Sequence, residues 1–137
     1  MLLSYTAGLR DQDDGFYKDT VKNMTSVIES GMKPEAYGWR GEAYLRLEKF
    51  AEAESDFRKA IEHAPHLPAN HAGLGAALAG QHRYREALAH FDDAIEMHER
   101  PGAPAPESVR RWGDEPGMVL ERRKEILETL DGHDESL

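Results

Sequence analysis

One segment of this chain occurs twice in a fixed register, and most of the residues that recur are apolar. The two copies are residues 34–67 and 68–100, and each begins with a proline. The recurring pairs are Pro34/Pro68, Gly41/Gly75, Ala43/Ala77, Glu52/Glu86, Ala53/Ala87, Phe57/Phe91, Ala60/Ala94, Ile61/Ile95 and Glu62/Glu96. A fixed period of this length is typical of proteins built from stacked repeats, so it constrains the fold more than any other feature.

Each copy predicts two helices joined by a turn, because its apolar residues recur at steps of three and four. In residues 34–67 the first stripe is Tyr37, Gly41, Tyr44 and Leu45, and the second, after a turn at residues 49–51, is Ala53, Phe57, Ala60 and Ile61. The glycine and alanine positions allow two helices to cross closely. We expect Phe57 and Phe91 to fill the space between successive hairpins.

This pattern resembles the tetratricopeptide repeat. The residues at the family's characteristic places are Tyr37, Gly41, Tyr44, Ala53, Phe57, Ala60 and Pro65 in the first copy, and Leu74, Gly75, Ala87, Phe91 and Ala94 in the second. The departures are Arg40, His71, Leu78 and Glu99. The resemblance implies an all-α fold, in which antiparallel helix hairpins form a right-handed superhelical stack.

The sequence before the two copies is interpreted as a weaker third one. About three units are needed for a stable stack, since each buries its apolar face against its neighbours. The register that aligns Met24 with Phe57 also aligns Gly8 with Gly41. Residues 1–33 are therefore predicted to form a degenerate first hairpin, and an unrelated helix that covers the end of the stack is the alternative.

The composition changes after Arg100. Residues 101–115 are rich in proline and glycine and predict a linker. Residues 116–131 then predict an amphipathic C-terminal helix, with Asp114 as its N-cap, whose apolar side consists of Val119, Leu120, Ile126, Leu127 and Leu130. Such a helix would cap the stack, or it would fold back into the groove of its own chain or of a second copy.

Charge and composition exclude several classes of partner. The chain has 26 acidic and 17 basic residues, a formal net charge of -9, which disfavours nucleic acid and anionic membranes. No cysteine is present, so no disulfide or cysteine zinc site is predicted. The chain also lacks an apolar stretch long enough for a signal or transmembrane helix. A cytoplasmic protein is expected.

The sequence gives no sign of catalytic chemistry. His63, His66 and His71 cluster near two prolines, but no carboxylate is fixed beside them, and the even spacing of His82, His90 and His98 turns each ring away from the last. Asp92, Asp93 and Glu96 are interpreted as a solvated face. No phosphate-binding loop or nucleophile elbow occurs. We therefore predict no enzyme, no cofactor and no metal site.

In the family that the chain resembles, the first helices of successive repeats line a concave groove that binds another protein. The resemblance thus implies a set of groove residues: Tyr5, Leu9, Glu35, Trp39, Glu42, Leu45, Arg46, Ala69, Ala72, Ala76 and Ala79. Members that bind acidic chaperone tails carry lysine, arginine and asparagine at such places, whereas this chain has Gly38, Glu42, Ala69 and Gly73. A clamp for carboxylates is therefore not expected.

Small residues beside an aromatic anchor suit an apolar or amphipathic helix, because the backbones approach closely and tryptophan is often a binding hot spot. The alternative is that Trp39 packs inside the stack. The predicted function is a protein–protein interaction module, an adaptor or scaffold that binds a peptide or helix of a partner protein. The other hypothesis is a structural subunit that forms a homodimer through the groove or the C-terminal helix.

Overall fold

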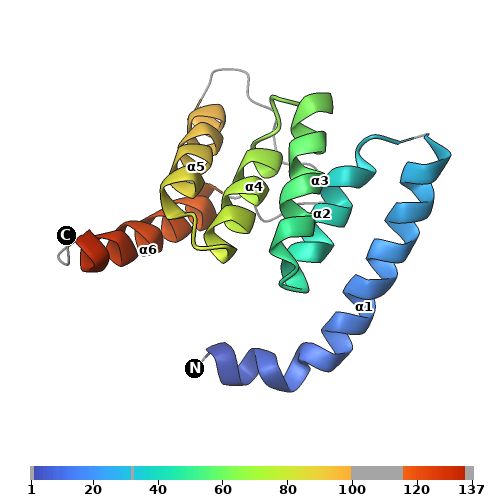
Figure 1. Ribbon diagram of the computed structural model, residues 1–137, viewed down its shortest axis with the longest axis horizontal. Helices are drawn as coiled ribbons and strands as arrows, with labels where there is room; N and C mark the ends of the chain where they lie inside the picture. The colour runs from blue at the N-terminus through green and yellow to red at the C-terminus, as the bar shows by residue number, and fades with distance from the viewer. Residues whose placement is uncertain (1, 32, 100–115, 135–137) are drawn as a thin grey trace.

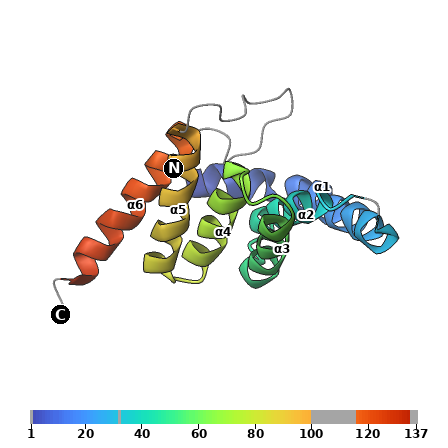
Figure 2. The same ribbon diagram turned by 90° about the horizontal axis from the view of Figure 1, so that it is seen from above.

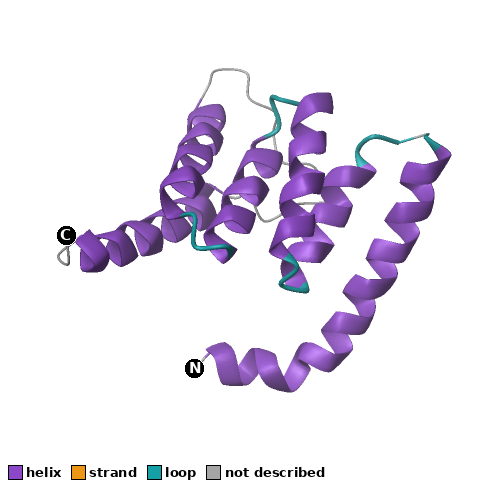
Figure 3. Cartoon of the chain, viewed as in Figure 1, coloured by secondary structure: helices purple, strands orange, loops and turns teal. Residues whose placement is uncertain are grey.

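The computed structural model of the protein describes residues 2–31, 33–99 and 116–134. Every regular element in this part of the chain is an α-helix, and none is a strand (Figure 3). The helices are α1 (Leu2–Ser30), α2 (Ala36–Arg46), α3 (Phe50–His63), α4 (Pro68–Gly80), α5 (Tyr84–Glu99) and α6 (Pro116–Asp134). The predicted linker, residues 101–115, and the predicted N-cap Asp114 lie outside the described residues.

Helices α2 to α5 form two antiparallel hairpins that pack side by side, in agreement with the predicted repeats (Figures 1 and 2). Both hairpins turn in the same way. Glu48 has a φ of 59°, and His82, its equivalent in the next repeat, has a φ of 64°. In each turn a backbone N–H donates a hydrogen bond to a carbonyl near the end of the preceding helix. Lys49 donates to Tyr44, and Arg83 donates to Leu78. The two copies are therefore alike in the backbone conformation of their turns as well as in sequence.

The core lies between consecutive helices and is centred on two phenylalanines. Phe57 and Phe91 are both completely buried, as predicted. A methyl group added at Gly41 would lie 3.1 Å from the ring of Phe57, and one added at Gly73 would lie 2.4 Å from it. Phe57 is thus held between α2 and α4, which belong to different repeats, and it joins them.

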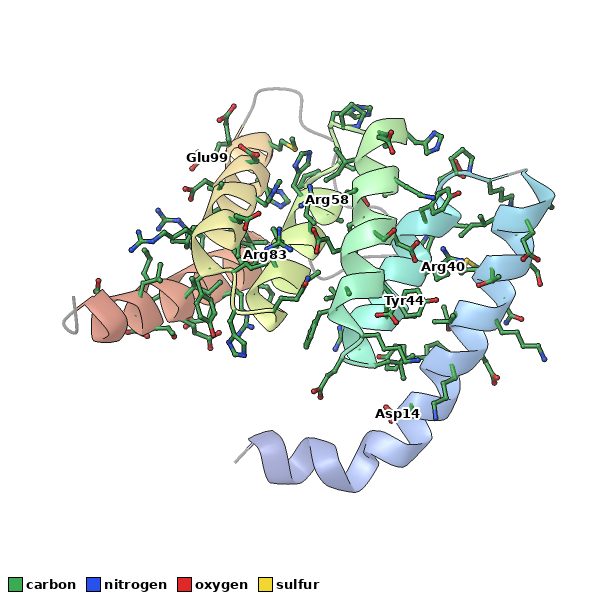
Figure 4. The ribbon with its side chains drawn as sticks, viewed as in Figure 1. Asp14, Arg40, Tyr44, Arg58, Arg83 and Glu99 are labelled. Atoms are coloured by element: carbon green, nitrogen blue, oxygen red, sulfur yellow. The ribbon has the colours of Figure 1, made fainter. Side chains whose placement is uncertain are left out.

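Helix α1 differs from the prediction for residues 1–33, because it is one continuous helix and not a hairpin. Its ribbon bends near Asp14, but the helix does not break there (Figures 1 and 4). Gly15 aligns with Glu48 in the register of the repeats, yet it keeps a helical φ. No proline interrupts residues 2–30, and each of its two glycines, Gly8 and Gly15, costs the helix only about 1 kcal/mol.

The second half of α1 retains the role that the repeat pattern assigned to it. Its predicted apolar stripe is half-buried, most of the residues between are exposed, and the helix packs against α2. The stripe consists of Tyr17, Thr20, Val21, Met24, Val27 and Ile28. The register of the weak first repeat therefore identified the packing face of α1 correctly but predicted a turn where the helix continues.

Helix α6 packs against α5 and caps the stack (Figure 2). Val119 and Ile126 are buried in the core, and Arg123 Nε donates a hydrogen bond of 2.6 Å to Asp92 Oδ1 on α5. Leu120 and Leu127 are exposed, in contrast to the prediction, because each is turned by about 100° from the buried residue before it. The helix continues beyond the predicted end at residue 131, to Asp134.

Candidate functional site

The predicted groove corresponds to two hollows along one face of α2. The first has a volume of about 320 Å³ and lies between α2, α4 and the end of α3. It is lined by Glu35, Trp39 and Ala69 from the predicted set, together with Pro34, Gly38, Ala60, His63, Ala64, Leu67 and Asn70. Trp39 is exposed, with 36% of its surface accessible to solvent.

The second hollow continues the same face toward the C-terminal end of α2. It has a volume of about 230 Å³ and is lined by the predicted residues Glu42, Leu45, Arg46 and Ala76, and also by Phe50 and Arg122. Glu35, Trp39, Glu42 and Arg46 follow one another at steps of three or four, so α2 presents all of them on one side. We refer to these two hollows together as the α2/α4 groove.

Two of the four predicted alanines do not belong to the surface of this groove. Ala72 is completely buried and Ala79 is 4% exposed, and both belong to the core. Ten of the thirteen residues of α4 are buried, since this helix is packed between α3 and α5 and also contacts α2. Ala72 and Ala79 line neither hollow, whereas Ala69 and Ala76 do. The side chains of Tyr5 and Leu9 lie outside those that the structure describes.

The glycines of α4 are likewise required by packing inside the protein. A methyl group at Gly80 would lie 2.3 Å from the ring of Phe50, and one at Gly73 would collide with Phe57. These contacts explain why α4 contains so many small residues. The small residues of α4 that the sequence assigned to a ligand surface are mostly a surface on which α3 packs.

An ion pair between Arg40 on α2 and Asp56 on α3 fixes the position of α2, the helix that carries Trp39. Arg40 donates two hydrogen bonds of 2.7 Å to Asp56, which is only 2% exposed, and a third of 3.1 Å to Thr25 on α1. The guanidinium lies 5.9 Å from the ring centroid of Tyr37 and 5.8 Å from that of Tyr44, which is drawn beside Arg40 in Figure 4. The bonds to Asp56 raise the pKa of Arg40 although burial opposes the charge. Arg40, a departure from the family pattern, thus connects three helices.

A second polar network joins the two hairpins. Glu54 on α3 accepts hydrogen bonds from Gln81 Nε2 at 2.9 Å and Arg83 Nη1 at 3.0 Å, both near the α4–α5 turn, and also from Arg58 (Figure 4). Burial alone would raise the pKa of Glu54, but these donors outweigh it and lower that pKa. The sequence does not reveal this network, because Glu54 belongs to one repeat and Gln81 and Arg83 to the next. Only the stacking of the hairpins brings them together.

The histidines are grouped differently from both sets considered in the sequence. His63 stacks on Tyr37 with 6.0 Å between ring centroids, His66 is exposed, and His82 bonds to the hydroxyl of Tyr84. Only one group with the composition and spacing of a metal site occurs among the described residues, and it joins His71 with His90 and Asp93. No periodicity within a single helix could have indicated it.

Two repeated helical hairpins, a groove on their first helices and a capping helix define a protein of the stacked-repeat class, whose members bind other proteins. Models of the tetratricopeptide repeat match residues 34–67 and 72–100. The two hairpins are therefore tetratricopeptide repeats. Repeats of this kind generally mediate protein–protein interactions and form a fold without catalytic chemistry of its own.

The structure is similar to the first TPR domain of the human RPAP3 protein, which was solved by NMR, with a TM-score of 0.70 and 20% sequence identity. The similarity covers 98% of this chain and 93% of that domain. At this identity it shows the shared fold. No curated protein matches the sequence. Within the described residues, no helix has both the length and the apolar character needed to cross a bilayer.

Proposed function

We propose that the protein is an interaction module whose α2/α4 groove binds an apolar or amphipathic helix of a partner protein. The observation that carries this proposal is the position of Trp39, which is exposed and forms one wall of the larger hollow. A large aromatic side chain beside a concave surface is the usual anchor of a protein interface. Gly38 and Ala69 beside it let another backbone approach closely.

The size and the lining of the groove favour a peptide over a small-molecule ligand. A volume of about 320 Å³ is at the lower end of the range of about 300–1,000 Å³ that is usual for small-molecule sites. A second hollow lies further along α2, so the two hollows together are elongated. An amphipathic helix would place successive apolar side chains, one or two turns apart, into the two hollows.

The charged residues at the rim suggest which way the ligand runs. Glu35 borders the first hollow, whereas Arg46, Arg122 and Glu42 border the second, which leaves the second hollow with one more positive than negative side chain. An acidic group or a helix C-terminus of the ligand carries negative charge, so either would be favoured beside the two positively charged arginines. The proposed ligand therefore has a basic or neutral end near Glu35 and an acidic end near Arg122.

The test is a selection of helical peptides from a random displayed library, followed by titration calorimetry of the selected peptides. We expect peptides with apolar residues at helical spacing, and Trp39→Ala should weaken their binding by about 2 kcal/mol or more. Phe16→Ala is the matched control, since Phe16 is an exposed aromatic residue on α1 that lines neither hollow. Equal losses in both variants would place binding elsewhere and contradict the proposal.

A second function, self-association, is favoured by the outer face of α6. Leu120 is 50% exposed and Leu127, two turns further along the same face, is also exposed, whereas Met118 lies on the opposite side of the helix. A homodimer formed through this face would cover Leu120 and Leu127. Sedimentation equilibrium distinguishes this hypothesis, because a dimer that Leu120→Glu dissociates and Trp39→Ala leaves intact would be formed through α6.

A further inference from the structure

Three potential metal ligands lie together at the interface between α4 and α5. His71 is on α4, and His90 and Asp93 are one turn apart on α5, so that both face the same neighbour. One ligand atom of each residue lies within 4.8 Å of the others. The two imidazole rings have centroids 6.4 Å apart with 29° between their planes.

The hydrogen bonding of His71 leaves one ring nitrogen available to an ion. His71 Nε2 lies 2.8 Å from the carbonyl oxygen of Pro65. Because a carbonyl can only accept, Nε2 carries the proton, and in the neutral ring Nδ1 then holds a lone pair. That nitrogen is buried and has no hydrogen-bond partner. A metal-bound histidine typically donates its other N–H to a backbone carbonyl in this way.

His90 is prepared for the same role. Its Nδ1 is also buried without a hydrogen-bond partner, so each ring offers an unsatisfied atom. Burial lowers the pKa of His90, and the neighbouring His71 acts in the same direction, although Asp93 opposes the change. Imidazole binds metals in its neutral form, which this environment favours at neutral pH. Buried polar atoms without partners are costly and require an explanation.

We propose that His71, His90 and Asp93 form a binding site for a divalent transition-metal ion such as Zn²⁺. Two imidazoles and one carboxylate are a ligand set that suits zinc, and a water molecule would complete four-coordination. Ligand atoms in a tetrahedral zinc site are about 3.4 Å apart, so the three groups must move closer by about an ångström. Asp93 is exposed and its side chain can rotate to do so.

The ion would act as a link between the two helices of the last hairpin. It would satisfy both orphan nitrogens and join α4, which forms the floor of the α2/α4 groove, to α5. An ion that binds only the folded protein stabilises it in proportion to the logarithm of its concentration. This site is independent of the groove function, because none of its three residues lines either hollow.

The test is titration of the untagged, chelator-treated protein with ZnCl₂ at pH 7.5, followed by calorimetry and by circular dichroism. We expect one ion per chain and a melting temperature that rises with zinc concentration. Asp93→Asn and His90→Gln should each weaken binding by about 100-fold, since loss of outer-shell groups alone costs roughly 10- to 100-fold. His71→Tyr should abolish it, and it introduces the residue found at the equivalent position, Tyr37.

The matched control is the double variant His63→Ala/His66→Ala, which removes two histidines near the same turn and keeps all three proposed ligands. It should bind zinc with unchanged affinity. Cobalt substitution gives a readout that does not depend on stability, because tetrahedral Co²⁺ ligated by these residues absorbs visible light and Asp93→Asn should change its spectrum. The proposal is overturned if no zinc binds, if binding survives His90→Gln unchanged, or if the control variant loses it.

Discussion

The hairpins α2–α3 and α4–α5 have the same turns and the same phenylalanine core, but they differ at the three positions that hold the proposed metal ligands in α4–α5. In α2–α3 these positions hold Tyr37, Asp56 and Lys59, and in α4–α5 they hold His71, His90 and Asp93. In the first hairpin the polar groups are satisfied by Arg40 and by the contact of Lys59 with the Tyr37 ring. In the second, two ring nitrogens have no partner.

The difference follows from one residue on the facing helix. Arg40 supplies Asp56 with two hydrogen bonds, whereas the equivalent residue of the next repeat is Leu74, which cannot donate. The same backbone frame thus gives a closed network in one unit and an open polar cluster in the other. In repeat proteins a shared core determines the fold, and the residues that depart from the pattern determine what each unit can bind.

The largest expected effect tests whether the two units really share one core. Phe57→Ala and Phe91→Ala should each lower the free energy of unfolding by about 3–5 kcal/mol, because both rings are completely buried and their removal leaves a cavity. Urea denaturation measures this. A cost below about 1 kcal/mol for either variant would show that its ring does not connect the helices around it.

The next effect tests the contrast between the Arg40–Asp56 network, which we call the closed cluster, and the group of His71, His90 and Asp93, which we call the open cluster. Asp56→Ala should cost about 3 kcal/mol, because it leaves Arg40 partly buried beside no carboxylate. His90→Ala should cost only about 1 kcal/mol, since its Nδ1 already lacks a partner.

The double variant Arg40→Leu/Asp56→Ala serves as the control for the closed cluster. It introduces leucine, the residue found at the equivalent position of α4, Leu74, and it should recover part of the stability lost in Asp56→Ala. The proposed contrast fails if Asp56→Ala and His90→Ala destabilise the protein equally in the same denaturation measurement.

A smaller effect sharpens the comparison between α1 and the two hairpins. Gly15→Ala should stabilise the protein by about 0.5–1 kcal/mol, because Gly15 has a helical φ and open space around it. Gly31→Ala is the opposite control, since its φ of 73° is strained for alanine. If Gly15→Ala destabilised the protein, the chain would need a turn at this point, as in the repeats.

The smallest effect is the pH dependence of the open cluster. Burial holds the pKa of folded His90 below the 6.5 of the unfolded chain, so the unfolded state binds more protons between these two values. The folded protein should therefore lose stability as the pH falls through 6.5. His71, Asp93, Arg58 and Glu86 contribute to the field at His90.

The measurement is the difference in unfolding free energy between the wild type and His90→Gln at pH 7.5 and at pH 5.5, in metal-free buffer. The wild type should lose more than the variant. Equal losses would indicate that the ring of His90 is solvated in the folded state.

The sequence predicted residues 34–99 well because the repeat pattern records local requirements. Small residues where helices cross, and a phenylalanine in each second helix, were enough to place four helices and their core. It predicted α1 and the groove less well. Gly15 permits a turn but does not require one, and the alanines of α4 look the same in the sequence whether they face a ligand or α3.

What the sequence determined by itself is the class of fold, since the repeat period fixes which side of each helix is apolar, and burial of that side forces the hairpins to stack. Tertiary structure decided which small residues remained open to a ligand and which polar residues met. His71 and His90 belong to different helices, and only the packing of α4 on α5 brings them together. The distance between these two side chains depends on how α4 and α5 cross, and the apolar pattern of one helix does not determine that crossing.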